Sequence, residues 1–268
     1  MGAKVTLIFL RTKTVNLRAM ITPNWFEDWF NSPYYHQLYK HRDEQEAEMF
    51  LHQLMAYLQP APGARMIDWA CGKGRHCKVL NEMGFDVTGV DLSEASIREA
   101  LEEENETLHF YQHDMRMPFC INYYAYALNM FTSFGYFPTQ REHDSAIHSM
   151  AIGLRKGGTL VMDYINVKKA SLELPQSYQQ KESDGLVFQI AKWQDEKHIF
   201  KQIQVADAPG STLRHLFTER VAKFTLNDFS DMMGYQGLQI REIFGDYHLA
   251  PFDAAHSPRL IIIADKVK

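Results

Sequence analysis

The sequence predicts a doubly wound α/β protein, in which a mainly parallel sheet carries helices on both faces. Apolar, strand-like segments alternate with amphipathic helical segments through the first 165 residues, at 66–70, 87–91, 108–112, 124–130 and 159–163. This alternation is typical of a parallel sheet built from strand–helix–strand units. Beyond it, three strand-like segments follow one another without a helix between them, at 186–193, 198–205 and 214–224. They predict an antiparallel addition to the sheet.

Local signals place the helices between these strands. Residues 43–58 carry apolar side chains at helical spacing before Pro60, and residues 75–83 form a second helical segment ending at Gly84. Ser93 is the predicted N-cap of a third helix. The Thr139–Glu142 capping box begins a fourth, which we expect to end at Gly157 and Gly158.

The last part of the chain predicts one more helix and two more strands. Thr225-Leu-Asn-Asp228 begins the helix, and the strands lie near 238–244 and 259–264. We therefore expect one domain over 20–268 after a disordered leader at 1–19. Its parts are listed in chain order: N-terminal lid helices at 20–60, a ligand-binding core at 61–165, the antiparallel insertion at 166–224, and the C-terminal helix with the last two strands at 225–268.

Composition narrows the functional classes. The 268 residues include 28 Lys and Arg against 33 Asp and Glu, a formal net charge of −5, which disfavours a protein that mainly grips nucleic-acid phosphates. The three cysteines, Cys71, Cys77 and Cys120, are too few for a disulfide framework and predict a reducing, cytoplasmic location. No apolar run reaches the ~18–20 residues of a membrane helix, so we expect no membrane partner.

The loop after the first strand points to a nucleoside ligand. Ligands of open parallel sheets bind at the carboxyl ends of the strands, and Gly72 and Gly74 allow the backbone to approach one closely. Asp91 ends the second strand, where a carboxylate can bind both ribose hydroxyls, and Asp114 follows the third strand, where one can accept from an adenine amino group. A dinucleotide fingerprint would need a third glycine where Cys77 stands, so an NAD enzyme is disfavoured.

These motifs resemble those of one enzyme family. The loop Asp68-Trp-Ala-Cys-Gly-Lys-Gly74, with the acid Asp91 at the next strand end, is similar to the first motif and its partner in class I S-adenosylmethionine-dependent methyltransferases. The similarity continues in 87–93, 112–119 and 154–158. It implies the Rossmann-like seven-stranded sheet of that family, an antiparallel β insertion after strand five, and S-adenosyl-L-methionine as the cofactor.

The resemblance also implies roles for single residues in cofactor binding. Ala70, Gly72 and Gly74 would lie under the methionine part, and Asp91 with Leu92 would hold the ribose and adenine. The remaining expected contacts are Asp114 and Met115 at the adenine edge, Asn129 and Phe131 beside the sulfonium, and Tyr35, Tyr39 and Arg42 on the lid helix. Asp68 either contacts the cofactor or only supports the glycine loop.

The acceptor side is less defined by the sequence. We expect substrate contacts from Tyr136, Tyr247, Asp253 and Arg259, and candidate bases at Tyr136, His248 and Asp163. The aromatic segment 131–137 is either core or substrate wall. Cys71, His76 and Cys77 lack a second ligand pair, so no metal site is expected.

The resulting functional expectation is an S-adenosylmethionine-dependent methyltransferase that acts on a small-molecule acceptor. A nucleic-acid or protein methyltransferase is the alternative within that class, although no N-P-P-Y sequence occurs. A non-catalytic module that binds S-adenosylmethionine is the alternative of another class. The oligomeric state is not predicted.

Overall fold

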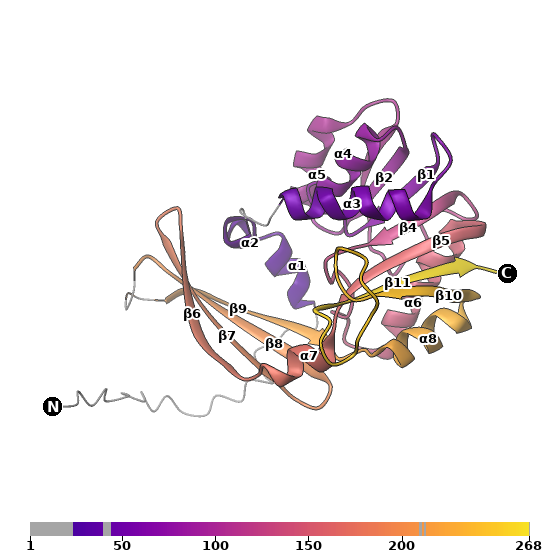
Figure 1. Ribbon diagram of the computed structural model, residues 1–268. Helices are drawn as coiled ribbons and strands as arrows, with labels where there is room; N and C mark the ends of the chain where they lie inside the picture. The colour runs from indigo at the N-terminus through magenta and orange to yellow at the C-terminus, as the bar shows by residue number, and fades with distance from the viewer. Residues whose placement is uncertain (1–23, 40–43, 209–210, 212, 268) are drawn as a thin grey trace.

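The computed structural model describes residues 24–39, 44–208, 211 and 213–267. The predicted leader at 1–19 and the expected lid residue Arg42 lie outside these residues. The described chain forms two sheets, one of seven strands and one of four (Figure 1).

The seven-stranded sheet has the order β10-β11-β5-β4-β1-β2-β3. Its members are β1 (Arg65–Trp69), β2 (Asp86–Asp91), β3 (Leu108–Gln112), β4 (Tyr124–Asn129), β5 (Leu154–Ile165), β10 (Leu238–Phe244) and β11 (Arg259–Lys266). Strands β1 to β5 pair in parallel, whereas β11 is antiparallel to both β5 and β10. The predicted doubly wound seven-stranded sheet is therefore confirmed.

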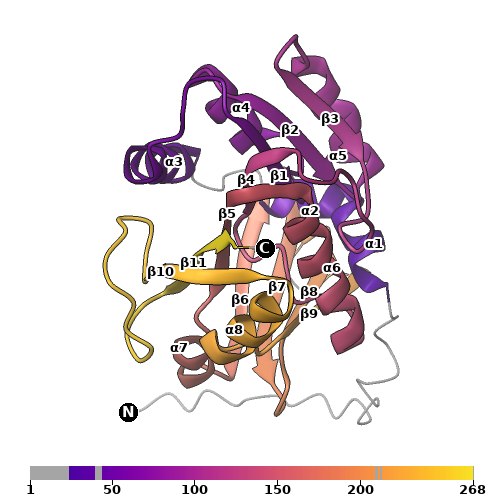
Figure 2. The same cartoon turned by 90° about the vertical axis from the view of Figure 1, so that its right-hand side faces the viewer.

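Helices cover both faces of this sheet because its central strands are apolar on both sides. One face packs against α3 (Glu44–Leu58), α4 (Arg75–Glu82) and α5 (Glu94–Ala100), and the other against α6 (Gln140–Gly153) and α8 (Leu226–Tyr235). Successive residues of β5 alternate between the two cores: Val161 belongs to the first, and Leu160 and Met162 to the second. Figure 2 shows the helices on either side of the sheet.

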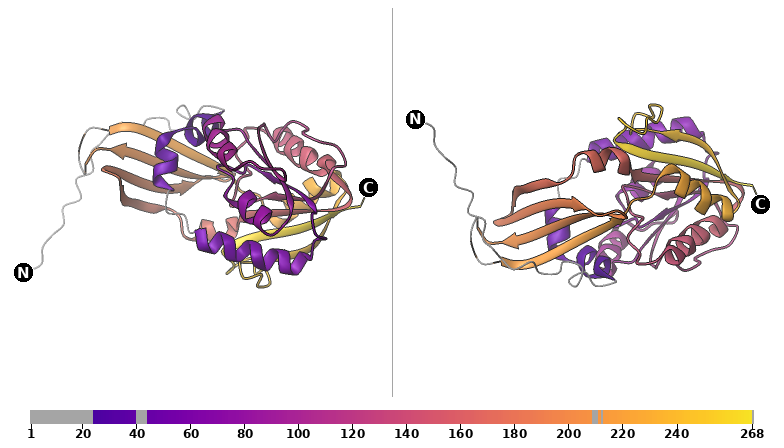
Figure 3. Two further views of the ribbon diagram at one scale, coloured as in Figure 1. Left: turned by 90° about the horizontal axis from the view of Figure 1, so that it is seen from above. Right: turned by 90° about the horizontal axis from the view of Figure 1, so that it is seen from below.

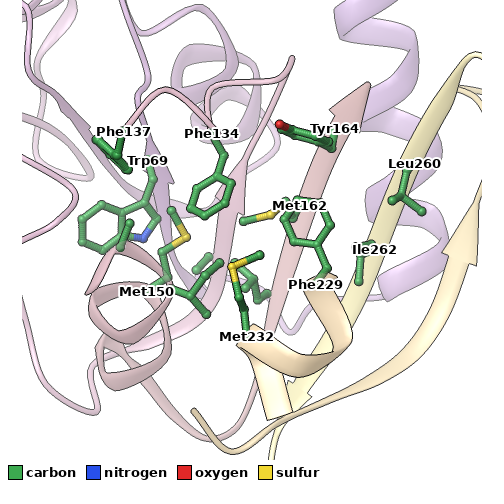
Figure 4. Close-up of a cluster of buried hydrophobic side chains, with 14 of the residues drawn as sticks. Trp69, Phe134, Phe137, Met150, Met162, Tyr164, Phe229, Met232, Leu260 and Ile262 are labelled. Atoms are coloured by element: carbon green, nitrogen blue, oxygen red, sulfur yellow. The ribbon is translucent and has the colours of Figure 1, made fainter. Parts of the chain in front are cut away.

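The second core is rich in aromatic and methionine side chains. Figure 4 shows Trp69, Phe134, Met150 and Met162 packed with residues of α8 and β11. Its buried members also include Phe188 and Ile203 from the four-stranded sheet, so one apolar cluster includes residues of both sheets. Among the described residues, no helix is both long and apolar enough to cross a membrane.

The antiparallel strands are inserted between β5 and α8, as predicted, but they form a sheet of their own and do not extend the main sheet, and they number one more than the sequence suggested. Its antiparallel strands are β6 (Gln176–Ser183), β7 (Leu186–Gln194), β8 (His198–Ala206) and β9 (Leu213–Ala222), joined to β5 by α7 (Val167–Leu172). Strand β6 was missed because its sequence, QSYQQKES, has almost no apolar residues. Both views in Figure 3 show this sheet projecting to one side of the larger one.

Two further boundaries differ from expectation. Helix α6 ends at Gly153, and β5 begins at Leu154, so Gly157 and Gly158 lie within the strand and do not end the helix. The pairing of β4 with β5 is irregular there, which accommodates the two glycines at the start of the strand.

Two short N-terminal helices lie between the sheets. They are α1 (Trp25–Phe30) and α2 (Pro33–Leu38), and both lie within the segment 20–60 that was predicted to form lid helices. Trp29 of α1 packs on Phe217 of β9, with ring centroids 4.6 Å apart. The N-terminal segment is thereby attached to the inserted sheet at the carboxyl end of the main sheet (Figure 1).

Candidate functional site

The glycine loop after β1 consists largely of left-handed backbone. Ala70, Gly72 and Gly74 have φ values of 61°, 58° and 78°. A Cβ on Gly74 would lie 2.5 Å from the Phe110 ring, so the packing requires glycine there. A Cβ on Gly72 would meet no atom of the described residues within 4 Å, because Gly72 borders an open pocket.

Asp91, the last residue of β2, hydrogen-bonds to this loop from the strand next to β1. Its two carboxylate oxygens accept the backbone N–H groups of Gly72 at 2.8 Å and Ser93 at 2.7 Å. Burial raises the pKa of Asp91, and these two hydrogen bonds partly oppose the rise. The carboxylate is thus fixed at the edge of the pocket, with a lone pair left on each oxygen for a ligand.

The pocket at the carboxyl ends of β1, β2 and β3 is called the rim pocket below. Nine residues expected from the sequence at the cofactor or the substrate line it: Tyr35, Ala70, Gly72, Asp91, Leu92, Asp114, Met115, Phe131 and Tyr136. Its aromatic wall, which the sequence analysis missed, includes Phe26 and Phe30 of α1. A neighbouring opening is lined by Tyr35 and Tyr39 of the lid segment and by the glycine loop.

Asp114 lines the rim pocket but is already paired. Arg116 donates to both of its carboxylate oxygens, with a shortest distance of 2.6 Å, and also to Glu142 at 2.9 Å. Burial alone would raise the pKa of Asp114, but the Arg116 hydrogen bonds and charge outweigh burial and lower it. Arg116 is therefore a structural partner of the adenine-edge candidate.

Two candidates from the sequence lie beneath the rim pocket, in the interior. Asn129 is fully buried and donates its Nδ2 to the Trp69 carbonyl at 3.0 Å. Asp68 is 1% exposed, and its Oδ2 lies 3.6 Å from His76 Nδ1. The His76 ring in turn stacks on Phe131, with centroids 5.0 Å apart. Of the two sequence interpretations of Asp68, this placement favours the supporting one.

A second cavity of about 630 Å³ lies between the two sheets and is called the intersheet cavity. Its wall combines Ile165 of β5 and Ala170 of α7 with residues of β7, β8 and β9. It also includes four of the predicted acceptor-side residues, Tyr136, Tyr247, His248 and Arg259. Phe131, Tyr136 and Glu219 line both this cavity and the rim pocket, so the two spaces are adjacent.

The buried side chain of Asp163 hydrogen-bonds to residues that line the rim pocket and the intersheet cavity. It is fully buried, and its carboxylate accepts from Arg259 Nε at 2.7 Å, from the Phe131 N–H at 2.8 Å and from the Tyr247 hydroxyl at 3.1 Å. Burial alone would lower the pKa of Arg259, but the Asp163 charge outweighs burial and raises it. Asp163 is committed to this cluster and does not line either space, which argues against a role as base.

The other acceptor-side candidates have different surroundings. The Tyr136 hydroxyl donates to the Thr132 carbonyl, and its ring borders both spaces. His248 lines the intersheet cavity. Asp253 is exposed, accepts the Ala255 N–H at 2.7 Å and lines none of the pockets described here, as expected for an ordinary turn residue.

The aromatic segment 131–137 contains both kinds of residue that the sequence allowed, core residues and residues of a pocket wall. Phe134 is fully buried in the core, whereas Phe131 and Tyr136 form walls of the pockets.

Cys71 and Cys77 are buried free thiols. Among the residues that the structure describes, no group of three or more His, Cys, Asp and Glu side chains is arranged to hold a metal ion.

Glu219 is the main site residue that the sequence analysis missed. Its Oε1 accepts from Trp29 Nε1 at 2.8 Å and from the Tyr39 hydroxyl at 3.1 Å, and it pairs with Lys201 Nζ at 3.5 Å. The signal was present: Glu219 lies two residues from both Phe217 and Val221, so an acid occupies the apolar face of a strand.

Comparisons with known proteins agree with this geometry. The family model described as "Methyltransferase domain" matches residues 60–204, which is more than half of the chain. A dTDP-3-amino-3,4,6-trideoxy-alpha-D-glucopyranose N,N-dimethyltransferase from Streptomyces venezuelae is 33% identical over 37% of this chain, and the match spans only 41% of that relative. The putative methyltransferase YqeM of Bacillus subtilis is 26% identical over 76% of this chain and 85% of its own length.

Solved structures show the same fold. An S-adenosylmethionine-dependent methyltransferase from Clostridium acetobutylicum superposes with a TM-score of 0.72 at 14% identity, covering 87% of this chain and 95% of the other. A sugar N-methyltransferase from a Streptoalloteichus species gives a TM-score of 0.67 at 21% identity, covering 87% and 93%. With the family match and the rim geometry, these findings show that the chain belongs to the methyltransferase-domain family of class I S-adenosylmethionine-dependent methyltransferases.

Proposed function

We propose that this protein transfers the methyl group of S-adenosylmethionine to a small molecule held in the intersheet cavity. The observation that carries the proposal is the wall that this cavity shares with the rim pocket, formed by Phe131, Tyr136 and Glu219. Methyl transfer is an in-line displacement, so donor and acceptor must meet across a short contact. Two adjacent spaces with a common wall allow this arrangement.

The residues of the rim pocket fit the cofactor. When bound, S-adenosylmethionine supplies the activated methyl group. Gly72 leaves open space where a side chain would project, and the fixed Asp91 carboxylate can accept from ribose hydroxyls. Tyr35 and Tyr39 border the neighbouring opening, where an aromatic face can attract a sulfonium. We therefore assign the donor to the rim pocket.

The protein contributes mainly positioning and exclusion of water. Asp163 holds the Phe131 amide in place, and Phe131 adopts a left-handed conformation with φ of 56°. A base is required only if the acceptor atom is protonated at the working pH. His248 and Tyr136 remain the candidates for that role, because both line the intersheet cavity.

A small acceptor is favoured over a macromolecule. The inserted sheet and α7 form part of the cavity wall, and the formal charge of −5 does not favour nucleic-acid binding. The relative from Streptomyces venezuelae is named as an N,N-dimethyltransferase of an amino sugar, and the structure from a Streptoalloteichus species as a sugar N-methyltransferase. Both names support nitrogen as the accepting atom.

Calorimetry with S-adenosylmethionine and S-adenosylhomocysteine tests the donor site. We expect Asp91→Ala to weaken binding by tenfold or more, because a charge-assisted hydrogen bond contributes about 1.5–3 kcal/mol. Asp86→Ala is the control, since Asp86 lies at the opposite end of β2 and pairs with Arg65. Absence of binding to the unmodified protein at millimolar ligand would refute the proposal.

Transfer of label from the methyl group of S-adenosylmethionine tests the acceptor class. With a fractionated cell extract, label should appear in the low-molecular-weight fraction. Label in nucleic acid or protein would support the macromolecular alternative. Tight donor binding without any transfer would support a non-catalytic binding module.

A further inference from the structure

The inserted sheet presents one mainly apolar face to the intersheet cavity. Side chains on one face of a sheet recur at every second residue of a strand. On this face Ile203 of β8 pairs in register with Ile190 and Phe217, and Ile199 pairs with Val221. Ile190, Ile199 and Ile203 are all less than 10% exposed, so the face is a largely dry surface.

One polar row crosses this apolar face. Lys192 of β7 lies directly opposite Lys201 of β8, and Lys201 lies directly opposite Glu219 of β9. All three line the intersheet cavity. Two like charges directly opposite each other destabilise a sheet, so an adjacent pair of lysines on an apolar face needs a negative partner.

Glu219 supplies that partner for only one of the lysines. Lys201 pairs with Glu219, hydrogen-bonds the Tyr39 hydroxyl and lies 4.5 Å from the centre of the Tyr39 ring. Within the part of the chain that the structure describes, Lys192 has no ion pair or hydrogen bond through its side chain. The carboxylates of Glu46, Glu173 and Asp246 also line the cavity, but they lie outside the inserted sheet, and among the described residues none of them pairs with Lys192.

We propose that Lys192, with Lys201 beside it, is an oxyanion subsite for the methyl acceptor. The acceptor would then carry a carboxylate or a phosphate ester, which Lys192 neutralises. This inference rests on the proposed function, because it assumes that the intersheet cavity holds the acceptor.

The polar row also gives the acceptor an orientation. Glu219 borders the rim pocket, whereas Lys192 borders only the intersheet cavity. Neighbouring strands lie roughly 4.8 Å apart, so the two ends of the row are separated by roughly 10 Å. The accepting atom therefore lies about that far from the anionic group of the same molecule.

Anion binding to the protein saturated with S-adenosylhomocysteine tests the subsite. Pyrophosphate and succinate are titrated separately by calorimetry, so the preferred probe distinguishes phosphate from carboxylate. We expect at least one of them to bind, Lys192→Gln to weaken that binding about tenfold, and Lys192→Arg to restore most of it. Lys181→Gln is the matched control, because Lys181 is exposed on β6 of the same sheet and outside the cavity wall.

Two results would overturn the subsite. Either neither anion binds the saturated protein, or Lys181→Gln weakens binding as much as Lys192→Gln, which indicates a non-specific charge effect. S-adenosylhomocysteine affinity is measured for each variant and should stay unchanged. Failure of the unmodified protein to bind S-adenosylhomocysteine would instead refute the proposed function itself, so the two failures are distinguishable.

Discussion

The buried carboxylate of Asp163 accepts the backbone N–H of Phe131 at 2.8 Å and thereby connects the end of β5 to the turn after β4. Phe131 and Thr132 are consecutive non-glycine residues with φ of 56° and 61°, a conformation that costs free energy. Arg259 stabilises the same turn by donating to Thr132 Oγ1 at 2.8 Å. The turn that separates the rim pocket from the intersheet cavity is thus held by a buried ion pair.

Replacing Asp163 by Asn should therefore destabilise the whole protein. The substitution removes the charge that compensates Arg259, and breaking a buried ion pair on one side costs about 3–5 kcal/mol. Equilibrium unfolding in urea measures the change in the free energy of unfolding. The control is Asp231→Asn, at an exposed position on α8, which should change stability by no more than about 0.5 kcal/mol. Equal stability of the two variants would contradict the role assigned to Asp163.

A pair of glycine substitutions separates backbone strain from ligand contact. Gly63 and Gly72 both have positive φ, 67° and 58°, and within the described part of the chain a Cβ on either would meet no atom within 4 Å. Alanine at either position should therefore bring similar backbone strain. Only Gly72 borders the rim pocket.

Gly72→Ala should consequently weaken S-adenosylhomocysteine binding by about tenfold or more, while Gly63→Ala leaves it unchanged. Calorimetry on both variants under one set of conditions gives the comparison. An unchanged affinity in Gly72→Ala would place the ligand away from the glycine loop.

The sequence predicted the main sheet well because its signals are local. Apolar strands, capping residues and the loop at 68–74 each act within a few residues, and Thr139 and Thr225 both form the capping boxes of their helices. The residues that border the rim pocket could be predicted for the same reason, because the carboxyl ends of parallel strands meet at one edge of the sheet.

The contacts of the acceptor-side residues could not be predicted from the sequence, because they depend on long-range packing. Glu219 reaches Trp29 and Tyr39 across about 180 residues of sequence, and no local pattern indicates that contact. Asp163 was proposed as a base, yet its partners Phe131 and Arg259 make it a structural anchor. Only the three-dimensional structure shows that the carboxylate of Asp163, near the end of its strand, already has hydrogen-bond partners within the protein.

Arg116 should control the pH dependence of ligand binding through Asp114. Hydrogen bonds and charge from Arg116 outweigh burial and lower the pKa of Asp114, so the carboxylate stays ionised and able to accept a hydrogen bond well into acid. In Arg116→Met this support is lost and the pKa rises. S-adenosylhomocysteine affinity should then begin to fall at a higher pH than in the unmodified protein, as measured by calorimetry from pH 7 downward.

Arg65→Met is the control for this experiment, because Arg65 pairs with Asp86 away from the rim pocket. Its pH profile should match that of the unmodified protein. Identical profiles for all three proteins would show that the Asp114 carboxylate takes no part in binding.

His143 should make the stability of the fold depend on pH. It is 3% exposed and lies among Phe134, Phe137 and Phe224. Its Nε2 has no hydrogen-bond partner among the residues that the structure describes. Burial lowers its pKa from 6.5 to about 4. Between these values the unfolded chain binds a proton that the folded chain does not, so stability is complete above pH 6.5 and decreases as the pH falls toward 4.

The shift corresponds to about 3 kcal/mol of stability lost across that range. Urea unfolding at pH 7 and pH 4.5 should therefore show a smaller pH effect in His143→Leu than in the unmodified protein. His148→Leu, at an exposed position on the same helix, should retain the full effect. If the pH effect persists undiminished in His143→Leu, then groups other than this buried imidazole account for it, because leucine cannot bind the proton that drives the difference.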